Sequence, residues 1–406
     1  MTSKTTPQAT SQTTPQATSL AGHRHKPTRV EDRGRLAVDL ARAVRGEVRF
    51  DRGSQALYAN DASVFRQVPI GVVIPRDADD VLAALAVCRD HDVPVLARGC
   101  GTGLAGQSVN AAVVFDFSKY MHQIVSLDAK TRTARVQPGV ICDQLRGAAA
   151  EHGLTFSVDP ATHDRCTLGG MIGNNSCGTH SVMGGKTVDN VLELDVVTYD
   201  GTRMTVGPTS PQEYERIVAG GGRQAEIYQA LKALAERYEP LIRDKFPEVP
   251  RRVSGYNLPD LLPDKEFNLA RALTGTESTC VLVLEAKVRL LPDPPHHALL
   301  VVGYADAAAA ADHVPALLQT QGLIGLIECV TDEHEPPYPA KITKDQVKKL
   351  TSALREGTPN RRRIALQMVR DLLDESSFDA SPAHAVPGPV ARTAAKVAGK
   401  LHGDDH

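Results

Sequence analysis

A glycine-rich segment between two apolar stretches limits the fold of this chain more than any other feature. It reads RGCGTGLAGQ from Arg98 to Gln107, and the residues before it (VPVLARG) and after it (AAVVFDF) are typical of buried strands. A Rossmann dinucleotide loop must open a helix, so a segment that leads into another strand excludes that fold. Four glycines at this spacing let backbone N–H groups turn inward around a phosphate or pyrophosphate, although a simple glycine-rich turn has the same composition. The candidate residues are Arg98, Gly99, Cys100, Gly101, Thr102, Gly103, Gly106 and Gln107.

A second segment rich in glycine and asparagine begins at Asp159. It reads DPATH and then CTLGGMIGNNSCG, ending at Gly178. We interpret it as one long loop whose glycines allow backbone contact with a flat ligand, while Asn and Ser side chains bond the ligand's polar edge. An irregular loop facing solvent is the alternative. The candidate cofactor-binding residues are Pro160, Thr162, Gly169, Gly170, Gly173, Asn174, Asn175, Ser176 and Gly178.

The order of predicted elements indicates an α+β fold. Strands and helices mix without the strict alternation that a doubly wound parallel sheet needs. The pattern predicts helices at 30–44, 77–91, 140–152 and 225–239, strands at 68–75 and 280–292, and hairpins at 124–136 and 192–207.

Several classes of protein are excluded or disfavoured. The stretch GGKT at 184–187 resembles the end of a P-loop, but the motif requires glycine where His180 stands. A net charge of −2 gives no basic excess for nucleic acid, and no apolar run is long enough for a transmembrane helix. The seven cysteines are scattered without a CxxC pair, which disfavours a zinc or disulfide framework and fits reduced thiols in a cytoplasm.

Four motifs in order resemble the FAD-linked oxidase family. They are RGxGTxLAGQ, PATHxRCTLGGMIGNNSCG, RRVSGYNLPDLLP at 251–263 and ARALTGTESTC at 270–280. The similarity runs from about residue 57 to about residue 302 and is greatest to the flavin subunit of glycolate oxidase and to D-lactate and D-2-hydroxyglutarate dehydrogenases. The resemblance implies a p-cresol methylhydroxylase-type FAD-binding domain, in which FAD lies extended between two α+β subdomains.

The resemblance also implies roles for single residues. The pyrophosphate would lie on the first segment, the flavin ring and ribityl chain on the second, Glu277 would close the site, and Asn257 would lie near the substrate. Gly103 stands where the family often has Ser, and Ser278 where it usually has Gly. FAD is expected to bind without a covalent bond, because the first segment contains no histidine. Cys166 is the alternative attachment point.

Composition and the resemblance together predict five regions along the chain. Residues 66–294 would form the FAD-binding domain, preceded by a helical lead-in at 29–65. A disordered tail is predicted at 1–28, where TTPQATS occurs twice. Residues 295–330 would be the start of a truncated substrate domain, and 331–406 a helical and disordered tail.

The implied reaction is hydride transfer from a D-2-hydroxy acid of the D-lactate, glycolate or D-2-hydroxyglutarate type to flavin. The substrate carboxylate, a base and a metal would be held in a further C-terminal domain that is not recognisable after Leu326, so no catalytic residue and no metal ligand is assigned. His296 and His297 are adjacent and are interpreted as surface residues. A catalytically incomplete FAD-binding protein is the alternative, and a nucleotide-sugar reductase of the cell-wall type fits the GYNL and GTESTC segments less well. The expected electron acceptor is a protein or a quinone, and the expected location is cytoplasmic, with peripheral membrane contact left open.

Overall fold

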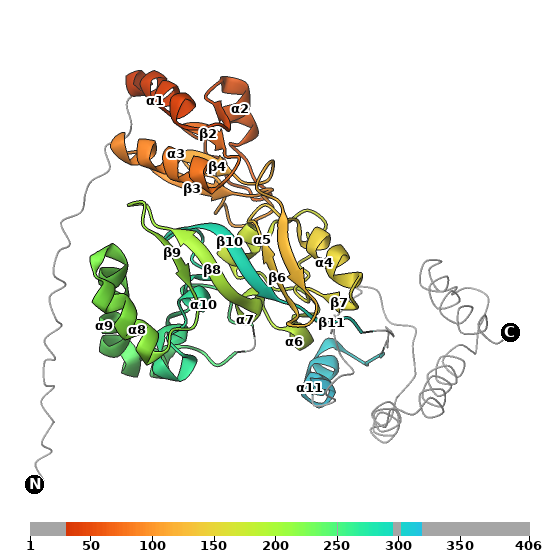
Figure 1. Ribbon diagram of the computed structural model, residues 1–406. Coiled ribbons are helices and arrows are strands. Elements are labelled where there is room, and N and C mark those ends of the chain that lie inside the picture. The colour runs from red at the N-terminus through yellow and green to blue at the C-terminus, as the bar shows by residue number, and fades with distance from the viewer. Residues whose placement is uncertain (1–29, 250, 295–301, 319–406) are drawn as a thin grey trace, which may run out of the picture.

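The computed structural model describes residues 30–249, 251–294 and 302–318. Two β-sheets, each covered by helices, make up the main body (Figure 1). The predictions for 1–28 and for the region after residue 318 lie outside the described residues, as do His296, His297 and Cys329.

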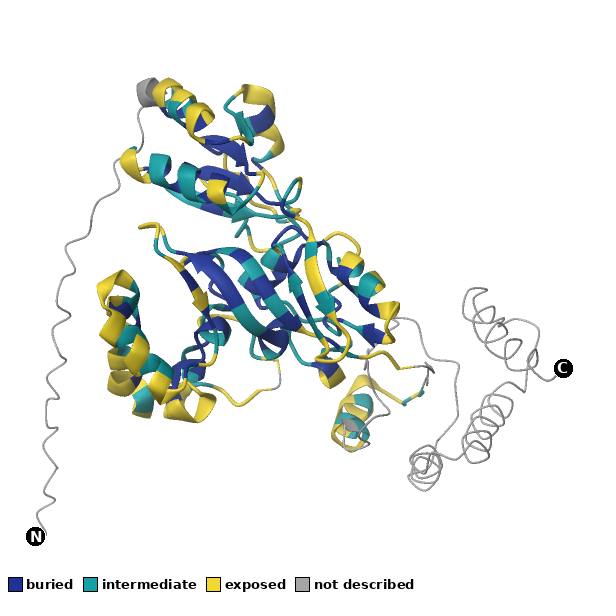
Figure 2. Ribbon diagram, in the orientation of Figure 1, coloured by how far each residue is buried: buried dark blue, intermediate teal, exposed yellow. Residues whose placement is uncertain are grey.

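The first sheet is a mixed sheet in the order β1-β2-β4-β3, in which β2 and β3 run parallel to β4 and β1 is antiparallel. Strands β2 and β4 are buried at every position because both faces of the sheet are covered. Helices α1 and α3 pack on one face of the buried strands (Figure 2). Tyr58 and Tyr120 pack against the other face. The elements are α1 (Val30–Ala43), β1 (Glu47–Arg49), α2 (Arg52–Leu57), β2 (Gly71–Ile74), α3 (Ala78–Asp90), β3 (Val95–Arg98) and β4 (Val113–Asp116).

The helical prediction for 29–65 is incomplete, because β1 lies inside it. This short strand pairs with β2, with Glu47 opposite Ile74. The Glu47 carboxylate accepts hydrogen bonds from Lys119 and from the Tyr120 hydroxyl, two partners more than seventy residues away in the chain. Such long-range contacts select an extended conformation that local sequence does not signal.

The second sheet is antiparallel throughout, in the order β5-β6-β10-β8-β9. Both predicted hairpins are confirmed, as β5–β6 and β8–β9. Helices α4, α5 and α9 contribute to the core beneath this sheet. The strands are β5 (Ile124–Asp128), β6 (Thr133–Val136), β8 (Val191–Val197), β9 (Arg203–Val206) and β10 (Leu282–Arg289), and a separate pair is β7 (Leu154–Thr155) with β11 (Leu291–Pro292). The helices are α4 (Cys142–Ala150), α5 (Leu168–Asn174), α6 (Ser181–Gly184), α7 (Thr187–Asn190), α8 (Pro211–Gly220), α9 (Gly222–Lys245), η1 (Leu258–Leu261), η2 (Pro263–Lys265), α10 (Leu269–Leu273) and α11 (Ala307–Leu318).

The two sheets share a hydrophobic core. Val197 of β8 and Leu282 and Leu284 of β10 pack among the buried residues of the first sheet. A polar contact adds to this, because the Tyr199 hydroxyl donates to the Val93 carbonyl at 2.8 Å. The α+β fold of two joined subdomains is therefore confirmed.

The interpretation of 159–178 as one long loop is wrong, because Leu168–Asn174 forms helix α5. The Thr167 side chain accepts a hydrogen bond from the Gly170 N–H at 3.3 Å and caps the start of the helix. Asn175, at φ 49° and ψ 49°, ends it in the left-handed region. Glycine is a poor helix former, so this helix depends on its caps and on tertiary packing.

A buried carboxylate joins the first helices to the first sheet. Asp80 is 3% exposed and accepts hydrogen bonds from the backbone N–H groups of Arg45 and Arg76, both at 2.9 Å. Asp80→Ala removes the acceptor and leaves both N–H groups without it. We expect a loss of about 2–3 kcal/mol in the free energy of unfolding, measured by urea denaturation.

The control for this prediction is Asp79→Ala. Asp79 is the neighbouring residue in the first turn of α3, and it is exposed. Its replacement is expected to change the free energy of unfolding by less than about 0.5 kcal/mol. Equal losses in the two variants would show that the Asp80 contacts are not the cause.

Candidate functional site

The first glycine-rich segment is the connection between two neighbouring parallel strands. It leaves the carboxyl end of β3 at Gly99 and enters β4 at Val113, without a helix in between. Parallel neighbours require a long crossover, and ligands of open α/β sheets bind outside the carboxyl ends of the strands. The segment therefore lies where a ligand site is expected.

Arg98 holds this connection in shape. Its guanidinium donates to the carbonyls of Ser108 at 2.9 Å, Asn60 at 2.7 Å and Tyr58 at 3.2 Å. It also lies over the Tyr58 ring at 5.3 Å from the centroid. In the described structure the Arg98 side chain closes the loop on the 58–60 segment, so its contacts are with protein carbonyls.

Most of the candidate glycines are required by packing within the protein. An ideal Cβ at Gly99 would stand 2.0 Å from Thr167 Oγ1, and one at Gly178 would stand 2.2 Å from the Asp159 carbonyl carbon. An ideal Cβ at Gly169 would stand 2.7 Å from Pro138 Cβ, which is also too close for a side chain. Gly101 and Gly106 have φ values of 67° and 78°, which few other residues adopt.

Two glycines of α5 differ from the rest. A Cβ at Gly173 would meet nothing closer than 4.0 Å, and one at Gly170 would meet only Thr167 Oγ1, at 3.3 Å. These positions leave open space beside the helix. They are the members of the second segment at which a flat ligand could approach the backbone.

Three of the predicted motifs meet at α5, which itself belongs to the second segment. The first segment reaches it through Gln107, whose Nε2 donates to Asn174 Oδ1 at 3.3 Å. The motif around Glu277 reaches it through two backbone bonds. The Gly275 N–H donates to the Ile172 carbonyl at 2.8 Å, and the Glu277 N–H donates to the Gly173 carbonyl at 3.0 Å.

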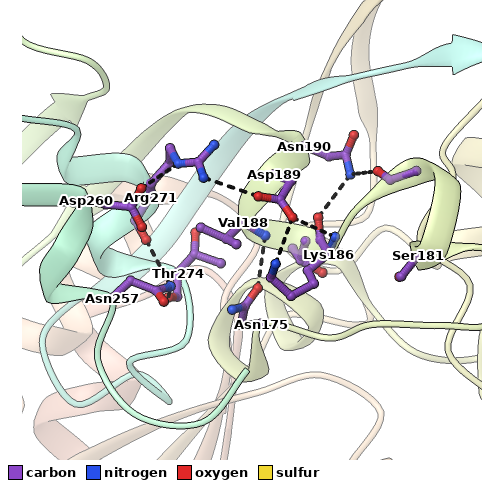
Figure 3. Close-up of polar contacts among 12 residues, drawn as sticks. Asn175, Ser181, Lys186, Val188, Asp189, Asn190, Asn257, Asp260, Arg271 and Thr274 are labelled. Atoms are coloured by element: carbon purple, nitrogen blue, oxygen red, sulfur yellow. Dashed lines mark hydrogen bonds and ion pairs between the residues drawn. The ribbon is translucent and has the colours of Figure 1, made fainter. Parts of the chain in front are cut away.

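A polar network fixes the loop that carries Glu277 (Figure 3). Arg271 of α10 bonds Asp260 at 2.7 Å and Asp189 of α7 at 3.2 Å, which ties two helical segments together. Asn257, 3% exposed, donates to the carbonyls of Thr274 at 2.6 Å and Arg271 at 3.3 Å. Asn257 therefore holds the loop in place, and its contact with substrate stays a prediction.

Asn175 carries an unused donor inside the site. It is fully buried, and its Oδ1 accepts from the Val188 N–H at 3.0 Å (Figure 3). Its Nδ2 has no hydrogen-bond partner among the described residues. A buried donor left unpaired costs free energy, so we expect this atom to donate a hydrogen bond to a ligand or to a water molecule.

Glu277 lies beside α5 in a strained conformation. Glu277 and Ser278 have φ values of 52° and 59°, although neither is glycine. Burial raises the pKa of the Glu277 carboxyl to about 7. Backbone strain and a shifted pKa together are typical of functional sites.

Two thiols lie below the site. Cys166 immediately precedes Thr167 and is 5% exposed, and Cys142 is fully buried. The backbone N–H of Cys142 donates to the Cys166 carbonyl at 3.0 Å, and both cysteines are free. Burial of Cys166 within the hydrophobic core favours the expectation of non-covalent binding.

Residues that sequence analysis did not single out complete the site. They are Thr167, which both caps α5 and packs on Gly99, the segment from Tyr58 to Asp61, and the Arg271 network. The Thr167 cap could have been predicted from the sequence, since a threonine directly before an apolar turn is a favoured helix start. Pro160 and Thr162 lie in a turn before α5, where the Thr162 carbonyl accepts from the N–H groups of Arg165 and Cys166.

Comparisons with known proteins agree with this geometry. Residues 69–207 match the family model described as FAD binding domain. This match identifies residues 69–207 as an FAD binding domain, which supports FAD as the cofactor.

Three curated relatives show the level of similarity. The chain is 35% identical over 287 residues to a D-2-hydroxyglutarate dehydrogenase of Pseudomonas putida, over 68% of this chain and 28% of that protein. It is 29% identical over 290 residues to glycolate oxidase subunit GlcD of Bacillus subtilis, over 70% and 51% respectively. It is 29% identical over 301 residues to a probable mitochondrial D-lactate dehydrogenase of Danio rerio, over 73% and 50%. The chain thus spans about half or less of the length of these relatives.

The residues present fit FAD. Gly170 and Gly173 leave the backbone of α5 open, and the unpaired Asn175 Nδ2 offers a donor to the cofactor's many acceptor atoms. The loop from Gly99 to Gln107 would hold the pyrophosphate, and Ser176 and Glu277 would lie along the rest of the molecule. Bound FAD supplies a hydride acceptor, and the protein's part is to position the cofactor and the substrate.

Among the described residues, no helix is both long and apolar enough to span a bilayer. In the same residues, no group of three or more His, Cys, Asp or Glu side chains is placed to hold a metal ion.

Gly101→Val tests the first segment. A Cβ at this position would stand 2.6 Å from Arg98 Nη2, which is already held by a carbonyl, and the backbone φ of 67° disfavours a branched residue. We expect the variant to lose FAD binding while both sheets still fold, measured by flavin absorbance after gel filtration and by circular dichroism.

Gly147→Val is the matched control. Gly147 lies in α4 with nothing within 4 Å of an added Cβ, and it should retain the flavin. A yellow Gly101→Val protein would show that the first segment does not hold the cofactor.

Glu277→Gln tests the shifted carboxyl. Because its pKa is raised to about 7 in the folded protein from an ordinary value near 4.5, folding favours the protonated form. The stabilisation is complete below about pH 4.5 and is lost as the pH rises through 7. In the wild type, this titration should lower the free energy of unfolding by roughly 1–2 kcal/mol across that pH range, after allowance for partial exposure. The Gln variant of the FAD-free protein should lack this pH-dependent change when it is measured by urea denaturation.

Glu248 is exposed and provides the control, since Glu248→Gln should leave the pH dependence of the free energy of unfolding unchanged. An unchanged pH dependence in Glu277→Gln would assign the titration to another group.

Proposed function

We propose that this protein is an FAD-dependent oxidoreductase that transfers a hydride from a D-2-hydroxy acid to flavin. The observation that carries the proposal is the meeting of three separate motifs at α5, which contains part of one of them and lies within a matched FAD binding domain. The relatives matched over about seventy per cent of this chain are named for D-2-hydroxyglutarate, glycolate and D-lactate. The substrate class follows from these names, and the particular acid within it is left to experiment.

The proposal includes the domain assignments. Residues 66–294 act as the FAD-binding unit, with 29–65 as its lead-in and with 295–330 as the beginning of a substrate domain. The arrangement of β10 supports an end of the unit near residue 294, since this strand completes the second sheet. The regions 1–28 and 331–406 are proposed to lie outside the FAD-binding unit.

The chemistry of a reduced flavin indicates which partners the protein needs. A reduced flavin must pass its electrons on, and the acceptor is proposed to be a protein or a quinone. We propose a cytoplasmic location, with the membrane surface as the place of contact if the acceptor is a quinone.

An alternative function is FAD binding without turnover. The chain spans 28% of the D-2-hydroxyglutarate dehydrogenase and 51% of the glycolate oxidase subunit, so the relatives have residues that this chain does not match. Transition-state stabilisation needs groups that hold the substrate carboxylate and accept a proton. If those groups lie only in the unmatched residues, FAD would bind here and remain oxidised.

Anaerobic stopped-flow absorbance separates these possibilities. The purified full chain, loaded with FAD, is mixed with millimolar D-lactate, glycolate or D-2-hydroxyglutarate. Bleaching of the flavin band by at least one acid, with L-2-hydroxyglutarate as the inactive control, supports the proposal.

Two outcomes contradict parts of the proposal. Full retention of oxidised flavin with all three acids favours the FAD-binding alternative. Flavin that stays in the pellet after acid precipitation would overturn non-covalent binding.

A further inference from the structure

Two buried cysteines face each other at the starts of helices α4 and α5. Cys142 is the first residue of α4, and Cys166 immediately precedes Thr167, the residue that caps α5. An isolated antiparallel bridge pairs Ile141 with Thr167, which places the two cysteines opposite each other. The backbone bond fits this register, because the Cys142 N–H donates to the Cys166 carbonyl at 3.0 Å.

This register suits a disulfide bond. Residues directly opposite each other in an antiparallel pair have Cα atoms about 4.5–5.5 Å apart, and a disulfide joins Cα atoms roughly 4.4–6.8 Å apart. The thiols themselves interact, since the side chain of Cys142 hydrogen-bonds to that of Cys166. Both cysteines are free and lie in the same hydrophobic core, where close packing holds their side chains in place. Closing the bond therefore requires little movement of the backbone.

The two thiols differ in acidity. The hydrogen bond from Cys142 lowers the pKa of the Cys166 thiol, burial opposes this effect, and a hydrogen bond from Thr162 lowers the pKa further. The same contact between the thiols raises the pKa of Cys142, and burial adds to the rise. Cys166 is therefore the thiol that ionises first and acts as the nucleophile, while Cys142 keeps its proton.

Cys166 lies at the edge of the core. Its exposed fraction is 5%, against 0% for Cys142. The turn that precedes it is open to solvent, since Asp164 and Arg165 are both exposed. Oxidation of a thiol depends on its ionisation and on its exposure, so this narrow access favours the smallest oxidants. Hydrogen peroxide is an oxidant of this size.

Cys88 shows that burial alone does not produce this arrangement. It is 0% exposed in the core of the first sheet, and burial raises the pKa of its thiol to about 12. Such a thiol stays protonated and inert near neutral pH. The position opposite a second thiol is what distinguishes Cys142 and Cys166 from Cys88.

We propose that Cys142 and Cys166 form a redox site, in which a peroxide converts the two thiols into a disulfide that joins α4 to the start of α5. The Cys166 thiolate attacks one oxygen of hydrogen peroxide, the O–O bond breaks, and a sulfenic acid and hydroxide form. The Cys142 sulfur then attacks the Cys166 sulfur, the S–O bond breaks, and the leaving hydroxide takes the Cys142 proton. The thiols lose two electrons, the peroxide gains them, and two water molecules result once the first hydroxide takes up the proton that Cys166 released.

The disulfide would act on the cofactor helix through its cap. Thr167 follows Cys166 directly, accepts the capping hydrogen bond of α5 and packs on Gly99. A bond between Cys142 and Cys166 closes the intervening loop in the unfolded chain and restrains local opening at the start of α5. The site does not depend on the proposed function, because neither thiol has a role in hydride transfer.

Peptide mapping tests whether the bond forms. The purified full chain is treated with hydrogen peroxide, its remaining thiols are blocked, and it is digested without reduction. Mass spectrometry should find peptides joined through Cys142 and Cys166 that separate on treatment with dithiothreitol, while Cys88 stays a thiol. Persistence of both thiols, or a bond between Cys166 and Cys100 in place of Cys142, would overturn the site. This measurement uses wild-type protein, so it decides the matter even if a variant fails to fold.

Thermal unfolding and hydrogen exchange test the effect on α5. Oxidation should raise the unfolding midpoint of the wild type by about 5 °C or more and should slow exchange of the α5 amides at least about threefold. Cys280→Ser is the control that should keep both effects, since Cys280 is exposed and lies outside the pair. Cys142→Ser should lose both effects and accumulate oxidised forms of Cys166 without a disulfide. Equal midpoints and exchange rates in the reduced and the oxidised wild type would show that the bond does not restrain α5.

Discussion

The close approach of Gly99 to Thr167 is the constraint on which the rest of the site depends. Only 2.0 Å separates Thr167 Oγ1 from the position of an ideal Cβ at residue 99, so no side chain fits between the two segments. At this point the crossover of the first sheet touches the start of α5, which packs beneath the second sheet. Thr167 makes the contact while it also caps α5. Thr167 thus fixes how closely the first glycine segment approaches α5, and it also fixes where α5 begins.

The loop after α10 follows from the same helix. Its backbone N–H groups at Gly275 and Glu277 bond the last carbonyls of α5, and these bonds hold Glu277 and Ser278 at positive φ. Such a conformation costs about 1–3 kcal/mol at each non-glycine residue, so surrounding structure must compensate for it. Asn257 and the Arg271 network supply that support from α10 and η1. The carboxyl of Glu277 is thereby kept half-buried beside the open face of α5, where its pKa is raised.

Local pattern predicted the regular parts of this fold, and tertiary contacts decided the rest. The helix at 77–91 and the two hairpins have strong periodicity and turn residues, and the structure confirms them with shifts of one or two residues at their ends. Helix α5 was missed because its three glycines oppose a helix. Its stability depends on the Thr167 cap and on tertiary packing, which includes the fit of Gly169 on Pro138. The structure brings the two glycine segments together at α5, but the reasons for most of their glycines were not visible in sequence. Gly99, Gly169 and Gly178 are small because protein backbone or side chains approach them, which depends on partners far along the chain.

The order of strands also couples completion of the site to completion of the fold. Strand β10 is the last long strand of the described chain, and it inserts between β6 and β8, which come more than eighty residues earlier. Before β10 pairs, the second sheet is two separate hairpins, and isolated hairpins are marginally stable in water. The loop that carries Glu277 directly precedes β10 and can reach α5 only when that strand is in place. Leu282 and Leu284 of β10 also fill the core of the first sheet, so the same insertion joins the two subdomains. A cofactor that contacts both glycine segments and the Glu277 loop would therefore bind the folded arrangement and not its separated halves, and its binding free energy would add to the stability of the fold.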